Sequence, residues 1–301
     1  MIKVENLTRK YGAFTAVDDI SFVCRPGRVT GFLGPNGAGK TTTMRVMVGL
    51  TPATHGQTTI GGHKYHDIPN PGRHVGVLLD ASAQHAGRTG REVLTIGAKT
   101  MGLPMSRVDE MLELVSLSGA EGKRRVRNYS LGMRQRLGIA HALLGDPSVL
   151  ILDEPANGLD PAGIRWMRGL LKGYADRGGT VLLSSHLLNE VEQIADDIIM
   201  IGRGKIVAEG TPAELLQSTG TFFKAVEVEQ LLDALVASGL HPAPVGDGYR
   251  VDAEALQVGK IAAANSVTLI ELRPADGGLE DMFLELTADT QREDFGQVAP
   301  A

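Results

Sequence analysis

The feature that most constrains this chain is the octapeptide at residues 34–41, Gly-Pro-Asn-Gly-Ala-Gly-Lys-Thr, which matches G-x-x-x-x-G-K-[ST]. It follows a β-prone run at 29–33 and precedes residues 40–50, whose pattern predicts a helix. Glycines let backbone N–H groups approach phosphate oxygens, and the N-terminus of a helix adds positive partial charge. The context therefore predicts an α/β core with a phosphate-binding loop, rather than an ordinary glycine-rich turn. The expected phosphate contacts are Gly34, Asn36, Gly37, Ala38, Gly39, Lys40, Thr41 and Thr42.

A second apolar run supplies the acidic partners that such a loop needs. Residues 149–152 are Val-Leu-Ile-Leu, typical of a buried parallel strand, and Asp153 and Glu154 follow directly. We expect Lys40 to reach the β- and γ-phosphates, Thr41 to hold Mg²⁺, and Asp153 to meet Mg²⁺ through water. Glu154 is expected to polarise the attacking water. A plain sheet strand with an acidic end is the alternative interpretation, and the phosphate-binding loop makes it the weaker one.

Composition excludes several classes of protein. The chain has 301 residues, 43% hydrophobic and 22% charged, so it can bury a core. Its formal net charge of −5 argues against a dedicated nucleic-acid-binding protein. The single cysteine, Cys24, excludes an internal disulfide. No apolar run approaches the roughly 20 residues that span a bilayer, so we expect a soluble chain that can dock on a membrane protein.

The order of the expected elements changes near residues 211–221, which divides the chain into two parts. We predict one domain over 1–215, a small α/β domain over 220–290 and a disordered tail over 291–301. In the small domain, the patterns predict strands at 222–227, 248–252 and 267–273, and helices at 229–238, 254–264 and 279–287.

Residues 128–136 resemble the signature loop of ATP-binding cassette (ABC) ATPases, usually written Leu-Ser-Gly-Gly-Gln. Ser130 and Gly132 match, whereas Tyr129, Leu131 and Met133 stand where that loop has Leu, Gly and Gln. A Ser-x-Gly at the start of a helix is by itself a weak signal, although such an end can hold phosphate. The loop lies 23 residues before Asp153, which makes the resemblance specific, and it implies that Ser130 and Gly132 contact nucleotide.

Further elements resembling the family follow in order. Residues 156–160 resemble the loop that joins two cassettes, His186 stands at the position of the switch histidine, and Tyr11 at that of an aromatic that stacks on adenine. The resemblance implies catalytic roles for Lys40, Glu154 and His186. One position departs from the family: Asp80 occurs where Gln is usual after the strand at 75–79, and we interpret it as a variant metal-sensing residue near Mg²⁺.

The resemblance implies a fold and an assembly. The fold is a P-loop cassette with a RecA-like core, an antiparallel β subdomain and a helical subdomain at about 85–145, followed by the small α/β domain. In this family two cassettes pack head to tail around ATP, so the implied partners are a second cassette, expected to be a second copy of this chain, and a separate multi-span membrane subunit. The chain would then lie in the cytoplasm, on the inner face of the membrane.

Residues 87–94 and 279–286 also resemble the branch of bacitracin- or anthracycline-export ATPases. This favours an exporter of an antibiotic-, drug- or lipid-like molecule, energised by hydrolysis of ATP. Three alternatives stay open: an importer subunit, an ABC ATPase that acts on ribosomes or DNA, and a different P-loop enzyme such as a small-molecule kinase. The single P-loop and the negative charge disfavour the second alternative, and the signature loop disfavours the third.

Overall fold

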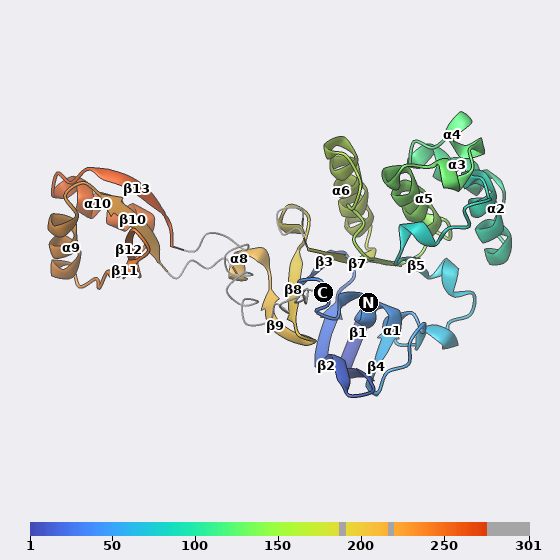
Figure 1. Cartoon of the computed structure of the whole chain (residues 1–301), viewed down its shortest axis with the longest axis horizontal. Coiled ribbons are helices and arrows are strands. Elements are labelled where there is room, and N and C mark those ends of the chain that lie inside the picture. The colour runs from blue at the N-terminus through green and yellow to red at the C-terminus, as the bar shows by residue number, and fades with distance from the viewer. Residues whose placement is uncertain (187–190, 216–219, 276–301) are drawn as a thin grey trace, which may run out of the picture. The chain divides into compact units, whose positions relative to one another are not determined.

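The computed structural model describes residues 1–186, 191–215 and 220–275. These residues form two compact units, one within Met1–Thr211 and one that begins at Pro212. Figure 1 shows the helices and strands of each unit.

The first unit is built on a six-stranded sheet with the order β5-β6-β7-β3-β8-β9. Its strands β5, β6, β7, β3 and β8 are parallel, and β9 pairs antiparallel with β8. Every residue of β6 and β7 is buried, as expected for strands covered on both faces. The bounds are β3 (Arg28–Leu33), β5 (Val75–Leu78), β6 (Val149–Leu152), β7 (Thr180–Ser185), β8 (Asp197–Gly202) and β9 (Lys205–Gly210).

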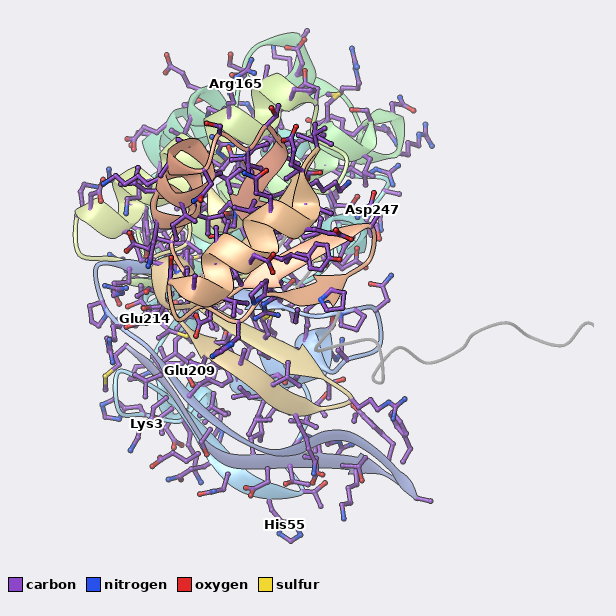
Figure 2. All side chains as sticks on the ribbon, turned by 90° about the vertical axis from the view of Figure 1, so that its left-hand side faces the viewer. Lys3, His55, Arg165, Glu209, Glu214 and Asp247 are labelled. Carbon is purple, nitrogen blue, oxygen red and sulfur yellow. The ribbon has the colours of Figure 1, made fainter. Side chains whose placement is uncertain are left out.

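A three-stranded antiparallel sheet, in the order β2-β1-β4, packs against this core. It comprises β1 (Ile2–Tyr11), β2 (Phe14–Cys24) and β4 (His55–Ile60). The Phe22 and Phe32 rings join the two sheets with centroids 5.4 Å apart. Helix α1 (Lys40–Met47) lies in the same core and buries Met44 and Met47. Lys3 on β1 and His55 on β4 are labelled in Figure 2.

A group of helices lies between β5 and β6 in the sequence (Figure 1). It comprises α2 (Gly90–Met101), α3 (Ser106–Leu114), α4 (Ala120–Lys123) and α5 (Leu131–Leu143). Thr89 and Glu92 close a reciprocal capping box that fixes the start of α2. Short 3₁₀ turns occur at Tyr65–Asp67, Pro71–Arg73, Ala81–Ala83 and Val126–Asn128. The predicted cassette fold, with its antiparallel sheet and its helical group, is confirmed.

Helix α6 (Pro161–Asp176) follows β6. The Asp160 side chain accepts a hydrogen bond from Gly163 N at 2.8 Å and caps its start. Met167 and Leu171 are buried, while Arg165, labelled in Figure 2, is exposed. Across the described residues, every helix is too short or too polar to cross a membrane.

The second unit has the element order β-α-β-β-α-β after the short helix α8 (Pro212–Leu215). Helices α9 (Val228–Ala237) and α10 (Ala255–Ala264) pack on one face of an antiparallel sheet in the order β11-β12-β10-β13. Phe223, Leu235 and Val258 are fully buried between the helices and the sheet. The strands are β10 (Thr221–Ala225), β11 (Ala243–Val245), β12 (Gly248–Val251) and β13 (Leu269–Pro274).

The small α/β domain predicted after residue 220 is confirmed as a fold. Strand β11 was not predicted, because its three residues are all exposed and include Pro244, so they carry no alternating pattern. The expected helix at 279–287 and the expected disordered tail at 291–301 lie outside the described residues. The limits 1–215 and 220–290 stay predictions; the four residues of α8 group with the second unit.

We expect the substitutions Leu94→Ala and Ile96→Ala, two residues apart on α2, to differ in their effect on stability. Leu94 is fully buried and Ile96 is 51% exposed. Leu94→Ala is expected to lower the free energy of unfolding by about 2–5 kcal/mol, and Ile96→Ala by about 0.5 kcal/mol or less. Urea unfolding followed by circular dichroism measures both, and equal effects would contradict the assigned faces of α2.

Candidate active site

The loop between β3 and α1 is packed so closely that two of its positions accept only glycine. A Cβ on Gly34 would lie 2.5 Å from the Ile201 carbonyl oxygen. Gly39 has φ +112°, and a Cβ there would lie 2.6 Å from the Ala16 carbonyl oxygen. The loop therefore keeps its backbone free of side chains at both ends, as a phosphate cradle requires.

Lys40 is the first residue of α1 and is 6% exposed. Its Nζ donates to the Gly34 carbonyl at 2.5 Å and lies 3.9 Å from Glu154 Oε1. Burial lowers the pKa of Lys40, while the carboxylates of Glu154 and Asp153 act in the opposite direction. The ammonium group is thus held at the loop by carbonyl oxygens and carboxylates, in a position to meet an anionic ligand.

Asp153 follows β6 directly and is 8% exposed. Its Oδ2 accepts a hydrogen bond from Thr41 Oγ1 at 2.5 Å, and its Oδ1 accepts one from Ser184 Oγ. A hydroxyl and a carboxylate oxygen side by side are the hard oxygen donors that Mg²⁺ prefers. Thr41 and Asp153, on two different elements, therefore fit a Mg²⁺ ion.

Glu154 occupies a left-handed backbone conformation with φ +48°, which is uncommon for a residue other than glycine. Its N–H donates to Ser184 Oγ at 2.9 Å, and its carbonyl accepts from Gln135 Nε2 at 2.9 Å. These bonds hold the strained backbone in place. The Oε2 atom of Glu154 lies 2.8 Å from Nδ1 of His186.

A cavity of about 280 Å³ opens between the loop, Asp153 and the start of β2. Tyr11 lines it, is 46% exposed and has the Arg9 guanidinium 4.3 Å above its ring. Phe14, which the sequence analysis did not single out, adds a second aromatic ring to the lining. The predicted site residues that line this cavity are Tyr11, Asn36, Gly37, Gly39, Lys40, Thr41, Thr42, Asp153 and Glu154.

The predicted site residues that do not line this cavity are Gly34 and Ala38 of the loop, His186, Ser130, Gly132 and Asp80. Ser130 caps α5, with its Oγ accepting from Met133 N at 3.2 Å, and Gly132 lies against the backbone of Gly158. Asp80 accepts hydrogen bonds from the N–H and the hydroxyl of Ser82, at 2.7 and 2.6 Å. The roles expected for Ser130, Gly132 and Asp80 therefore stay predictions.

Besides Phe14, two residues that support the site through hydrogen bonds were not predicted. Ser184 joins Asp153 to the backbone of Glu154, and Gln135 binds the Glu154 carbonyl. Ser184 is part of the buried strand β7, where a polar residue within an apolar run is a signal for a hydrogen-bonded role. Gln135 is 3% exposed but lies between Arg134 and Arg136 in the sequence, so its burial could not be read from the pattern.

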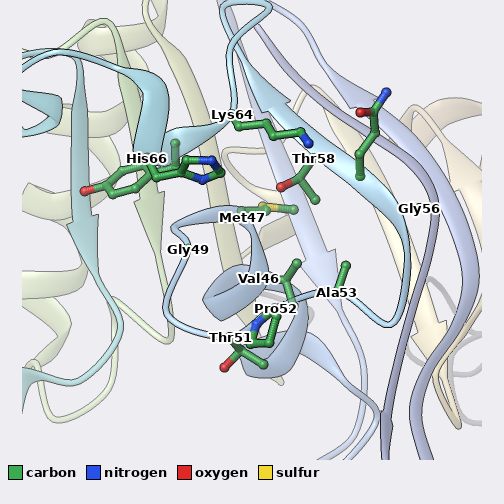
Figure 3. A pocket seen from close by; sticks show the side chains of 12 residues that line it. Val46, Met47, Gly49, Thr51, Pro52, Ala53, Gly56, Thr58, Lys64 and His66 are labelled. Atoms are coloured by element: carbon green, nitrogen blue, oxygen red, sulfur yellow. The ribbon is translucent and has the colours of Figure 1, made fainter.

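A second cavity, of about 310 Å³, adjoins the opposite end of α1 (Figure 3). Val46 and Met47 of α1 line it together with Lys64 and His66. Within the described residues, no three His, Cys, Asp or Glu side chains are grouped to hold a metal ion. This cavity is separate from the site around Lys40.

Comparison with known proteins identifies relatives over the whole chain. The family described as ABC transporter matches residues 17–157. The "Uncharacterized ABC transporter ATP-binding protein YhcH" of Bacillus subtilis is 37% identical, covering 97% of this chain and 98% of that protein. The "Bacitracin transport ATP-binding protein BcrA" of Bacillus licheniformis is 36% identical, covering 95% and 97%. The "Linearmycin resistance ATP-binding protein LnrL" of B. subtilis is 32% identical, covering 97% and 100%.

Solved structures resemble the first unit. A structure described as the "ATP binding subunit of ABC transporter" aligns with a TM-score of 0.66 at 28% identity, covering 71% of this chain and 91% of that one. The "Dimeric Structure of MJ0796, a Bacterial ABC Transporter Cassette" aligns with a TM-score of 0.63 at 23% identity, covering 70% and 98%. The latter similarity supports the fold.

We expect Ser184→Ala to slow hydrolysis of ATP, because it removes the hydroxyl that orients Asp153 and the backbone of Glu154. Loss of hydrogen bonds to a charged group costs about 1.5–3 kcal/mol, which corresponds to a decrease in kcat of about 10- to 100-fold. A steady-state phosphate-release assay measures kcat. The control is Ser148→Ala, an exposed serine that does not line the cavity. Equal kcat values for the two variants would contradict the positioning role of Ser184.

Proposed function

This chain belongs to the family of ABC transporter ATP-binding proteins, and we propose that its cargo is an antibiotic-, drug- or lipid-like molecule exported through a separate multi-span membrane subunit. The chain is the ATP-hydrolysing subunit that energises the transporter. The observation that supports ATP hydrolysis is the convergence of Lys40, Asp153 and Glu154 on one cavity beside the glycine-rich loop.

The substrate ATP would place its phosphates against the loop and the N-terminus of α1. Lys40 would turn its ammonium from the Gly34 carbonyl to the β- and γ-phosphates, forming charge-assisted hydrogen bonds. Thr41 and Asp153 would hold Mg²⁺, which would supply positive charge to offset the negative charge of the phosphates. Tyr11 would stack on the adenine ring.

Glu154 is the residue we propose to orient the attacking water and accept its proton. Its left-handed backbone and its bonds to Ser184 and Gln135 fix the carboxylate at the edge of the cavity. His186, 2.8 Å from that carboxylate, would contact the γ-phosphate and keep the Glu154 side chain aligned.

A second cassette would complete the site. Ser130 and Gly132 are at the N-terminus of α5, a second end suited to phosphate, and they do not line the cavity of their own chain. We propose that two chains pair head to tail, so that the signature loop of each closes on the ATP of the other. ATP then favours the closed state because it binds that state more tightly, and hydrolysis releases it.

Asp80 is proposed to act at the same site as a metal-sensing residue. Two hydrogen bonds from Ser82 lower the pKa of its carboxyl, which keeps it ionised. An ionised carboxylate can approach Mg²⁺, whereas the Gln usual at this position would supply a neutral oxygen.

The exporter assignment rests on the relatives. Two of the proteins related over almost their whole length are named for bacitracin transport and for linearmycin resistance. These names support a cargo of antibiotic-like chemistry. The net charge of −5 disfavours the alternative of an ABC ATPase that acts on ribosomes or DNA. We propose that the chain lies on the cytoplasmic face of the membrane, held there by its membrane subunit.

We expect Glu154→Gln to bind ATP, to hydrolyse it at least about 100-fold more slowly and to accumulate as a dimer with ATP. The amide keeps the size of the side chain but cannot accept the proton from water. Phosphate release measures hydrolysis, and sedimentation velocity measures the dimer.

The control for this prediction is the double variant Lys40→Ala/Glu154→Gln. It lacks the ammonium that binds phosphate, so ATP should no longer bring two chains together. Hydrolysis by Glu154→Gln at close to the native rate would contradict the assigned role of Glu154.

The transport assignment is tested by purifying tagged chain from detergent-solubilised membranes and identifying its partners by mass spectrometry. A multi-span membrane protein in stoichiometric amount is the expected result. Co-expression of the two proteins should then raise the tolerance of a sensitive bacterium to a peptide antibiotic, and Lys40→Ala should abolish the gain. Recovery of ribosomal or DNA-associated proteins in place of a membrane protein would overturn the assignment.

A further inference from the structure

Arg9 on β1 is a cation with no part in the chemistry proposed for the site. The residue is partly buried, and its guanidinium carbon lies 4.3 Å from the centroid of the Tyr11 ring. The face of an aromatic ring carries negative partial charge, so it attracts a cation placed above it. Tyr11 in turn lines the cavity beside the phosphate-binding loop, whereas Arg9 does not. Arg9 therefore meets the site through the Tyr11 ring.

A second contact holds the guanidinium of Arg9 in place. Its Nη1 donates a hydrogen bond to the Pro52 carbonyl at 3.0 Å. Its Nε is buried and has no hydrogen-bond partner among the described residues. Burying an unpaired N–H is unfavourable, and the attraction of the guanidinium to the Tyr11 ring offsets part of this cost. The head group of Arg9 is thus fixed between the Pro52 carbonyl and the ring.

Pro52 belongs to a segment that is also bonded to the residues on either side of Arg9. Thr54 N donates to the Thr8 carbonyl at 2.8 Å, and Lys10 N donates to Thr54 Oγ1 at 2.9 Å. This segment follows α1, and Pro52 lies near the end of that helix (Figure 3). The strand that carries Tyr11 is therefore attached at three successive residues to the chain that leaves α1.

Helix α1 thereby connects the two ends of the proposed nucleotide site. It begins at Lys40, directly after the phosphate-binding loop, and the segment that follows it holds Arg9. Tyr11 is the last residue of β1 and is 46% exposed. An exposed ring has access to several side-chain rotamers unless a neighbour restricts it. Arg9 covers one face of the ring, so a planar base has the other face to stack on.

We propose that Arg9 is a positioning residue for the adenine base, which fixes the Tyr11 ring in its stacking orientation before the nucleotide binds. The inference rests on the proposed stacking of Tyr11 on adenine. Ordering a side chain before its ligand arrives removes part of the entropy cost of binding. Arg9 should therefore strengthen binding of the base and leave binding of the phosphates unchanged.

The test is calorimetric titration of the full chain, in the presence of Mg²⁺, with ADP and separately with pyrophosphate. Pyrophosphate carries two phosphates, as ADP does, but no base. Arg9→Gln removes the cation and should raise the dissociation constant for ADP about three- to tenfold. The dissociation constant for pyrophosphate should stay at its native value, because Lys40 and the loop are unaltered. Lys10→Gln, the same loss of charge at the adjacent exposed residue, is the matched control and should bind both ligands like the native chain.

A double-variant cycle tests whether Arg9 acts through Tyr11. Tyr11→Ala removes the ring and should weaken binding of ADP. In that background Arg9→Gln should have no further effect, because the ring that it positions is gone. In steady-state hydrolysis, Arg9→Gln alone should raise KM for ATP and keep kcat at the native value, as expected when ground state and transition state lose the same interaction.

Equal losses of affinity for ADP and for pyrophosphate in Arg9→Gln would overturn the proposal, because they would indicate a change in the phosphate-binding loop. Additive losses in the double variant would also overturn it. If Tyr11→Ala weakens binding of ADP but Arg9→Gln does not, Arg9 has no positioning role and the stacking by Tyr11 stands. Native binding of ADP by Tyr11→Ala would instead overturn the stacking itself, together with the role of Arg9.

Discussion

The parallel register of β6, β7 and β3 is the constraint on which the site depends. Leu152 pairs with Leu183, and Leu33 pairs with Ser185, so the three strands end at the same edge of the sheet. The residues that follow or end these strands, among them Asp153 and Ser184, are brought together there although long stretches of sequence separate them. A shift of one residue in any of these strands would turn the side chains at its end to the opposite face.

At this edge, a small polar network replaces the apolar packing of the core. Asp153 is buried, but both of its carboxylate oxygens accept hydrogen bonds from hydroxyl groups, which offsets the loss of hydration. The same Ser184 hydroxyl accepts the Glu154 N–H and supports a strained backbone. The orientation of Glu154 therefore depends on Ser184 of β7 as well as on β6, the strand that precedes it. Backbone strain of this kind persists where the surroundings determine it, and such places are often functional.

In the second unit, the two faces of the sheet are covered by different kinds of side chain. Its sheet is covered by helices on one face, and the opposite face is closed by charged side chains that neutralise one another, with Phe222 beneath them. The relatives cover almost the whole chain, so they share this second unit as well as the cassette.

The sequence alone determined the phosphate-binding loop, the acidic residues after β6 and the presence of a second α/β unit. Each of these is encoded locally, by spacing within a few residues or by the apolar pattern of a single element. The cassette fold was predicted from the resemblance of several such motifs, in their order, to the ABC family. Tertiary structure decided the contacts between distant residues, which no local sequence pattern predicts. It placed Ser184 between Asp153 and Glu154, buried Gln135 against a loop 19 residues away, and left Ser130 outside the cavity of its own chain. It also decided that, among residues 220–275, β10 lies between β12 and β13, because the order of strands in a sheet depends on how the chain crosses over, and separate strands give no sign of that order.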